Sequence, residues 1–171
     1  QGVSGLHVHV GMPSSDACFH ALEGVLPWLP VVLAISANSP YLAGEETGML
    51  SNRAEVLAQL PRSGAPPAFR SYEDWEEFVE LFARLDMGAD YTRFWWDIRP
   101  HPRLGTLEIR MPDQPTALER TAGIATVLVE LCRAVLDRRQ RTWDPAARGL
   151  YQQNRWAAAR NTLELGAASA K

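Results

Sequence analysis

Two neighbouring stretches decide the fold, Arg93-Phe-Trp-Trp-Asp-Ile-Arg99 and Leu104-Gly-Thr-Leu-Glu-Ile-Arg-Met111. Both are typical of β-strands, in which successive side chains point to opposite faces of a sheet. In the second stretch this alternation places Glu108 and Arg110 on one face and aliphatic side chains on the other. The connection over residues 100–105 is short enough for a hairpin-like turn between the two strands.

A third strand is predicted near the start of the chain. Residues Leu6 to Val10 alternate Leu, His, Val, His and Val, so His7 and His9 point to the same side. In the first stretch above, Asp97 and Arg99 share a face in the same way. We therefore expect three strands to bring ionisable groups to one shared polar face.

Hydrophobic periodicity between and after these strands indicates helices. Ser71 with Asp74, and Thr116 with Glu119, form capping-box patterns that begin two of them. Apolar residues follow each cap at helical spacing, so they are expected to face the core. The first set is Trp75, Phe78, Val79, Phe82 and Leu85, and the second is Leu118, Ala122, Ala125, Leu128, Cys132 and Val135. Helices are expected over residues 14–26, 28–37, 51–60, onward from 71, 116–139 and 144–165.

The order of elements is one strand, several helices, two adjacent strands and two further helices. This order is typical of an α+β fold, in which an antiparallel or mixed sheet is covered by helices on one face. The 171 residues, of which 46% are apolar, fit one domain over residues 1–171.

Composition excludes several classes of partner. The net charge of -3 gives no electrostatic reason to expect nucleic acid or an anionic membrane. The longest apolar run, residues 25–37, is short for a membrane span and contains Pro27 and Pro30. Cys18 and Cys132 lack the spacing of a disulfide framework or a zinc site. Small polar substrates fit this composition better.

Each polar pattern, taken alone, has a structural reading beside a functional one. His7 and His9 are a metal-binding pair or simply strand histidines, and Glu108 with Arg110 is a site or an ordinary exposed strand face. Together, a carboxylate, imidazoles and guanidinium groups on one face are what phosphoryl transfer requires. The segment Arg99-Pro-His-Pro-Arg103 adds phosphate ligands in Arg99, His101 and Arg103, or is a proline-stiffened turn.

A long loop over residues 41–69 is rich in Gly, Pro, Ser and Glu, and loops of this length are often functional. Within it, Arg53 is a clamp for a substrate carboxylate or a solvated loop arginine. The chain contains no P-loop, dinucleotide-binding or nucleophile-elbow motif, so any nucleotide would be bound by another architecture.

The ordered series of motifs resembles the bacterial carboxylate-amine ligases, also called type 2 glutamate-cysteine ligases. The matching stretches cover most of residues 4 to 113. They are Ser4-Gly-Leu-His-Val-His-Val-Gly11, residues 30–40 ending Ala37-Asn-Ser-Pro40, Gly44, Thr47-Gly48, Ser51 and Arg53, Pro61-Arg-Ser-Gly64, Pro66-Pro67, Phe69, Trp95-Trp-Asp-Ile-Arg-Pro100 and Leu107-Glu-Ile-Arg110.

The resemblance implies a sheet similar to that of glutamine synthetase catalytic domains and a two-step, ATP-dependent reaction. ATP would phosphorylate the γ-carboxylate of glutamate, and cysteine or another amine would attack the acyl phosphate to form an amide. By resemblance, His7 and Glu108 look like ligands of Mg²⁺, with Mn²⁺ an alternative, and Arg110 and Glu108 look catalytic. Asn38, Ser39 and Arg53 look like substrate-side residues.

The chain also departs from that family. The acidic Gly-x-Glu-x-Glu type motif of the family's N-terminal strand is absent, so we expect these residues to be an incomplete part of a longer catalytic domain. A homodimer, or another chain that supplies the missing strand, is expected to complete the site in the cytoplasm. Two alternatives stay open, a non-catalytic module that binds an amino acid or a partner chain, and a zinc hydrolase built on His7 and His9. The amine acceptor stays open as well.

Overall fold

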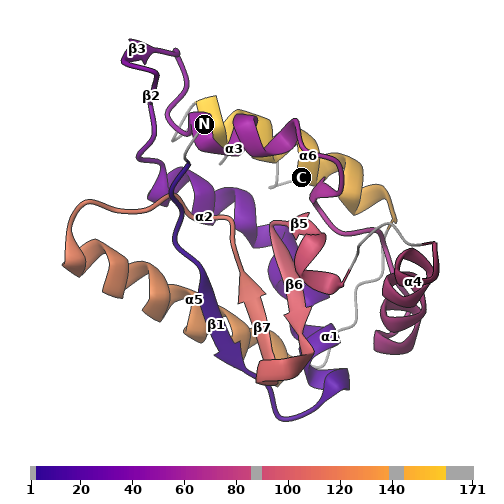
Figure 1. The fold of residues 1–171 in the computed structure, drawn as a ribbon. Coiled ribbons are helices and arrows are strands. Elements are labelled where there is room, and N and C mark those ends of the chain that lie inside the picture. Colours follow the sequence, from indigo (N-terminus) through magenta and orange to yellow (C-terminus); the bar gives the residue numbers. More distant parts are fainter. Residues whose placement is uncertain (1–2, 86–89, 139–144, 161–171) are drawn as a thin grey trace.

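A small antiparallel sheet lies at the centre of the computed structural model, which describes residues 3–85, 90–138 and 145–160. Its strands are β1 (Val8–Gly11), β6 (Ile98–His101) and β7 (Thr106–Ile109), in the order β1-β7-β6. Helices α1 (Ser15–Val25) and α5 (Leu118–Arg138) lie behind this sheet, and its other face is open toward the viewer (Figure 1). The α+β prediction, with helices on one face of a sheet, is confirmed.

The remaining elements surround one end of this sheet. Helix α4 lies beside β6, and α3 and α6 run across the end at which β7 finishes (Figure 1). Two short pairs of strands, β2-β3 and β4-β5, and three 3-10 turns connect them. The elements are α2 (Leu29–Ser36), β2 (Tyr41–Leu42), β3 (Glu45–Glu46), α3 (Asn52–Ala58), β4 (Ser63–Gly64), α4 (Tyr72–Arg84), β5 (Trp95–Trp96), α6 (Pro145–Arg160), and the 3-10 turns η1 (Leu26–Trp28), η2 (Tyr91–Arg93) and η3 (Pro102–Leu104).

The register of the sheet separates an apolar face from a polar one. Glu108 on β7 lies opposite His9 on β1 and Arg99 on β6. Leu107 and Ile109 point to the other side, where they are fully buried in the core. The predicted alternation of residues 104–111 is therefore confirmed, and so is the turn after Pro100, where Gly105 adopts a left-handed conformation with φ of 62°.

The first helical pair forms the centre of the core. The side chain of Ser14 caps α1 by accepting a hydrogen bond from the backbone N–H of Ala17 at 3.1 Å. Residues Ser15–Ser36 are long and apolar enough to span a membrane by length and composition, but 67% of the most apolar 18-residue window is buried inside the protein. Burial of this kind is what the core helices of a globular domain show.

The predicted core stripes are correct in part, and Ala122, Leu85 and Leu118 are exposed instead of buried. Trp75, Leu128 and Cys132 are buried, as predicted. Leu85 is 60% exposed because it follows the last turn of α4, and Leu118 is 78% exposed because α5 begins before it reaches the sheet. Phe78, Val79, Phe82, Ala125 and Val135 are only partly buried against the core. Asp144 and the segment 161–165, predicted as the cap and end of the last helix, lie outside the described residues.

Leu107→Ala should lower the free energy of unfolding by about 3 kcal/mol, because it removes a fully buried side chain from the central strand. Exposed Leu118→Ala is the matched control and should change stability by less than about 0.5 kcal/mol. Urea denaturation followed by tryptophan fluorescence measures both. Equal effects in the two variants would show that the face of β7 has been assigned wrongly.

Candidate active site

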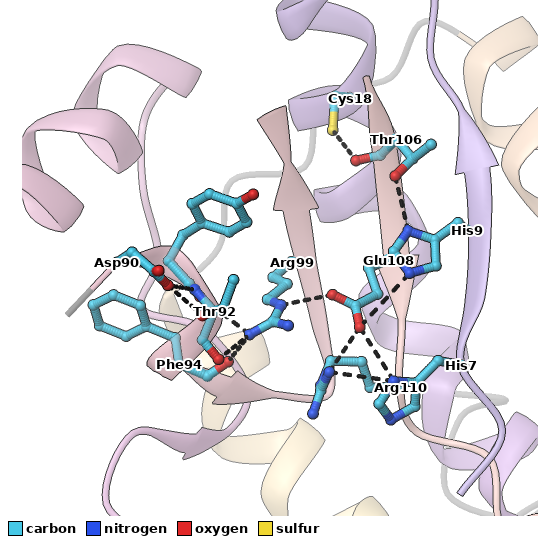
Figure 2. A network of polar contacts seen from close by, with 11 residues as sticks. His7, His9, Cys18, Asp90, Thr92, Phe94, Arg99, Thr106, Glu108 and Arg110 are labelled. Carbon is cyan, nitrogen blue, oxygen red and sulfur yellow. Dashed lines mark hydrogen bonds and ion pairs between the residues drawn. The ribbon is translucent and has the colours of Figure 1, made fainter. Parts of the chain in front are cut away.

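The carboxylate of Glu108 is the centre of the polar face. It is 3% exposed and contacts basic side chains that lie on or directly next to all three strands. Its Oε2 accepts a hydrogen bond from Arg99 Nε at 2.7 Å, and its Oε1 accepts one from Arg110 Nη1 at 2.7 Å. His7 Nδ1 lies 3.3 Å and His9 Nε2 lies 3.8 Å from the same Oε1. Figure 2 shows Glu108 between Arg99 on one side and His7, His9 and Arg110 on the other.

These contacts keep Glu108 ionised. Burial by itself raises the pKa of a carboxyl group, but the hydrogen bonds from His7 and Arg99 and the charges of Arg99 and Arg110 outweigh it. The pKa of Glu108 is therefore held well below its usual range. Burial, with the nearby positive charge of Arg99, lowers the pKa of the Arg110 guanidinium, and Glu108 opposes this shift. One carboxylate beside two guanidinium groups gives the face a surplus of positive charge, which suits an anionic substrate.

Arg99 is buried and largely committed to the protein itself. Its Nη1 donates to the backbone carbonyl oxygens of Tyr91, Thr92 and Phe94 at 3.1, 2.8 and 2.7 Å. With Nε bound to Glu108, the side chain joins η2 to the sheet, as Figure 2 shows. Its geometry supports a structural role for Arg99 in orienting Glu108, whereas its predicted role as a phosphate ligand stays a prediction.

His9 and His101 extend the polar face toward the β6–β7 turn. Their rings meet edge to face with centroids 5.2 Å apart, and His9 Nδ1 lies 2.9 Å from the hydroxyl of Thr106. Burial, together with the charges of His101, His7 and Arg99, lowers the pKa of His9, and Glu108 opposes this, so its imidazole is neutral at pH 7. His101 and Thr106 line a cavity of about 300 Å³, and Arg103 is exposed on η3 beyond it.

A second polar network lies just past the end of β7, around the fully buried carboxylate of Asp113. Its Oδ2 accepts hydrogen bonds from the backbone N–H of Asn38 at 2.9 Å and from the Ser39 hydroxyl at 2.7 Å. Its Oδ1 accepts one from the Ser51 hydroxyl at 2.9 Å. Asn38, Ser39 and Arg53 all line a cavity of about 330 Å³ beside this network. The three residues predicted to lie on the substrate side are thus brought together.

Arg53 differs from the expected clamp in its environment. It is 4% exposed, and its guanidinium donates to the carbonyl oxygens of Arg110 at 2.8 Å and Met111 at 3.0 Å. Asp113 lies 3.7 Å from the same group. Arg53 therefore holds the backbone that carries Arg110.

Gly5 is needed beside this arginine. A Cβ atom at position 5 would lie 2.2 Å from the Nη2 atom of Arg53, closer than any real contact. Gly5, which lies two residues before His7, also forms a β-bridge with Asp113. The glycine of the Ser4-Gly-Leu-His stretch thus lets the start of the chain pack directly on the Arg53 guanidinium.

Asp97 was predicted to share the polar face with Arg99, and the structure corrects this. A single residue interrupts the strand here, since β5 ends at Trp96 and β6 begins at Ile98. The alternation is broken at this point, and the Asp97 carboxylate accepts hydrogen bonds from Tyr151 Oη at 2.7 Å and Arg155 Nε at 3.0 Å, both on α6. Asp97 therefore connects the sheet to α6 and takes no part in the polar face.

The residues proposed as metal ligands have a suitable separation. Adjacent ligands of an octahedral Mg²⁺ lie about 3 Å apart, because each is about 2.1 Å from the ion. His7 Nδ1 and Glu108 Oε1 are 3.3 Å apart. Over the residues that the structure describes, however, no group of three His, Cys, Asp or Glu side chains is placed to hold a metal ion. These residues fit two positions around an ion and no more.

The sequence did not reveal Asp113, Tyr151 or Arg155. The partners of Asp113 lie 62 to 75 residues away along the chain, and those of Asp97 lie 54 and 58 residues away. No local pattern distinguishes such residues from exposed ones. The alternating Leu-Glu-Ile-Arg pattern, by contrast, was a sufficient signal for Glu108 and Arg110.

Comparison with known proteins gives a consistent result. A family model described as glutamate-cysteine ligase family 2 matches residues 1–168. The chain is 40% identical over 164 residues to a Rubrobacter xylanophilus protein provisionally named glutamate–cysteine ligase 2-3, covering 96% of this chain and 44% of that protein. Provisionally named glutamate–cysteine ligases of Solibacter usitatus and Frankia alni are 36% and 38% identical, and each match covers 95% of this chain and 43% of the relative. The chain thus spans less than half the length of these relatives.

Arg53→Met should destabilise the protein by about 3 kcal/mol, because two buried carbonyl groups and the Asp113 carboxylate lose their cation. Arg84→Met is the matched control, since Arg84 forms an exposed pair with Glu80, and it should cost less than about 0.5 kcal/mol. Chemical denaturation of the two variants measures the difference. An Arg53→Met variant as stable as Arg84→Met would mean that Arg53 is not part of the buried network.

Gly5→Ala should also destabilise the protein, by about 2 kcal/mol, because the added methyl group must displace the Arg53 guanidinium. The double variant Gly5→Ala with Arg53→Met should lose less than the sum of the two single changes, since both act on the same contact. A double-mutant cycle by urea denaturation tests this. Strict additivity would contradict direct packing of Gly5 on Arg53.

Proposed function

Because the chain belongs to glutamate-cysteine ligase family 2, we propose that its polar sheet face is part of the active site of an ATP-dependent carboxylate–amine ligase. The observation that carries the proposal is Glu108, a buried and ionised carboxylate held between Arg110 and His7 on an open sheet face. Unlike the buried carboxylates of Asp113 and Asp97, which bind groups within the protein interior, Glu108 lies beside the partly exposed His7 and His9 side chains.

The proposed reaction has two steps. An oxygen of the glutamate γ-carboxylate attacks the γ-phosphorus of ATP, the bond to the bridging oxygen breaks, and ADP leaves. The amine nitrogen of the acceptor, with cysteine as the first candidate, then attacks the acyl phosphate carbon, phosphate departs and the nitrogen loses a proton to solvent. Arg110 faces the open side of the sheet, where its guanidinium would neutralise charge on the transferred phosphoryl group.

Mg²⁺, or Mn²⁺, would be held by Glu108 Oε1 and His7 Nδ1. Bound there, a divalent ion would reduce the negative charge of the phosphate groups. Two guanidinium groups already surround Glu108, so a further cation needs more carboxylates or the phosphates of the nucleotide nearby. Arg99 would orient Glu108 for this role through its fixed contacts with η2.

The two cavities beside the polar face would receive the substrates. The one lined by Asn38, Ser39 and Asn52 is the candidate for the amino-acid side, with Arg53 as its support. The one lined by His101 and Thr106 is the candidate for the nucleotide, with exposed Arg103 beyond it on η3. In this arrangement the substrates approach Arg110 and Glu108 from opposite ends of β7.

Completion of the site is proposed to come through β1. Among the described residues β1 pairs only with β7, so its second edge is free to accept another strand. A strand that carries carboxylates, from the remainder of a longer chain or from a second copy in a homodimer, would supply the missing ligands. The extended sheet would then be similar to that of glutamine synthetase catalytic domains, in a cytoplasmic enzyme.

Glu108→Gln in the complete protein should lower kcat for amide formation by about a hundredfold or more, because Gln cannot carry the charge that the ion and both guanidinium groups require. The assay follows ADP release and γ-glutamyl amide with glutamate, cysteine, ATP and Mg²⁺. Glu130→Gln on the exposed side of α5 is the matched control and should leave kcat unchanged. Full activity in a folded Glu108→Gln variant would refute the site assignment, and glutamate binding that needs neither ATP nor metal would favour a binding module.

His7→Ala should raise the Mg²⁺ concentration for half-maximal activity by at least about tenfold. Loss of a residue that only orients a metal ligand lowers metal affinity by about tenfold or more, and loss of a direct ligand should lower it at least as much. His7 is partly exposed, so the variant should remain folded. His20→Gln, on the helical side where His20 contacts the Val135 carbonyl, is the control. An unchanged Mg²⁺ requirement in His7→Ala would remove His7 from the metal site.

A further inference from the structure

The Pro61-Arg-Ser-Gly64 stretch and the Pro66–Pro67 pair contribute no side chain to the polar face around Glu108. They line a separate cleft of about 500 Å³ between β4, α4 and the start of α6. The described lining residues include two arginines and no acid. The cleft is lined by Arg62 and Arg148 and by the apolar side chains of Pro66, Phe78 and Trp96, among others.

Arg62 has no anionic partner among the described residues. Its guanidinium lies over the rings of Phe94 at 5.5 Å, Phe82 at 5.7 Å and Trp95 at 6.0 Å. These rings hold the cation in place by cation–π contact while leaving its charge unneutralised. Its Nε–H is shielded from water and has no acceptor in the part of the chain that the structure describes, and a buried donor left unpaired is destabilising. A ligand acceptor would relieve this destabilisation.

The backbone of Arg62 is also held in an unusual conformation. Its φ is +60°, in the left-handed region that residues other than Gly seldom adopt. Gly64 follows with φ of +78° and packs closely on Gln152 of α6. The turn is therefore shaped by its surroundings and directs Arg62 toward the aromatic rings, which is typical of a residue kept for a function.

Arg148 is the second arginine that lines the cleft. Its Nη2 is paired with Glu23 Oε1 at 2.6 Å, so its charge is already balanced. Arg62 is therefore the source of the cleft's single net positive charge. A monoanion matches this charge, whereas a phosphate dianion would exceed it. Phe78, Trp96 and Pro66 supply apolar walls beside the cation.

We propose that this cleft binds a monocarboxylate with an apolar body, with Arg62 as the carboxylate anchor. The planar guanidinium fork can meet both oxygens of a carboxylate, and the aromatic and proline walls can cover an apolar body. None of the residues of the Glu108 network lines this cleft. The site is thus independent of the proposed ligase chemistry.

The test measures binding of 3-phenylpropanoate to the complete protein by isothermal titration calorimetry, with 3-phenylpropanamide as the uncharged analogue. The carboxylate should bind saturably, and the amide at least tenfold more weakly. Arg62→Gln should weaken carboxylate binding at least tenfold, and Arg62→Lys should restore part of it. Arg84→Gln, an exposed change on neighbouring α4, should leave binding unchanged.

Several outcomes would overturn the proposal. They are equal affinity for the carboxylate and the amide, unchanged binding in a folded Arg62→Gln variant, and absence of binding to the complete protein, which would mean that another segment fills the cleft. Glu108→Gln separates this proposal from the ligase proposal, because it should lower kcat for amide formation by about a hundredfold or more and leave 3-phenylpropanoate binding intact. Loss of probe binding in Glu108→Gln would place the probe at the sheet face and refute the cleft.

Discussion

The structure depends on one buried carboxylate, that of Glu108, and on the cations that surround it. A charge removed from water must be paired, and the partners of Glu108 are Arg99 on β6 and Arg110 just after β7, with His7 and His9 at the side of β1. A shift of one residue in either strand pairing would turn Glu108 toward the core, where it would have no partner. The same interaction therefore fixes the register of the sheet and creates the polar face.

Two further buried carboxylates, those of Asp113 and Asp97, are paired in the same way outside the sheet. Asp113 joins the turn after α2, the start of α3 and the end of β7, and Arg53 supports it while holding the Arg110 carbonyl. Asp97 joins the beginning of β6 to α6 through Tyr151 and Arg155. A backbone bond of 2.8 Å from Arg110 N–H to the Asp97 carbonyl links these regions. The backbone of Arg110 is thus held on both sides, by the Arg53 guanidinium and by the Asp97 carbonyl.

The sequence predicted the parts of this arrangement that depend on local periodicity. The alternation in residues 104–111 identified the face of Glu108 and Arg110, and Ser14 and Ser71 marked the starts of α1 and α4 correctly. The exposure of Leu85 and Leu118 could not be predicted, because periodicity defines a helix face and not the point at which the helix leaves the core. The prediction for Asp97 was wrong because a single residue that interrupts the strand changes the face to which its side chain points.

The features that the sequence did not predict are set by contacts between residues far apart in the chain. The environment of Arg53 is set by carbonyl groups 57 and 58 residues away, so its sequence neighbourhood suggested a loop arginine or a substrate clamp. The proposed metal site also depends on residues beyond this stretch of sequence. The chain offers two candidate ligands at a suitable separation and spans less than half the length of its relatives. The central claim is that the Glu108 face is one part of a site that other residues complete.

The most direct test is a crystal structure of the complete protein with Mn²⁺ and a non-hydrolysable ATP analogue, with the ion located by its anomalous scattering. The account predicts a peak within bonding distance of both His7 Nδ1 and Glu108 Oε1, with further carboxylates from residues outside these 171. Mn²⁺ bound elsewhere, with His7, Glu108 and Arg110 still closed on one another beside an empty face, would contradict it.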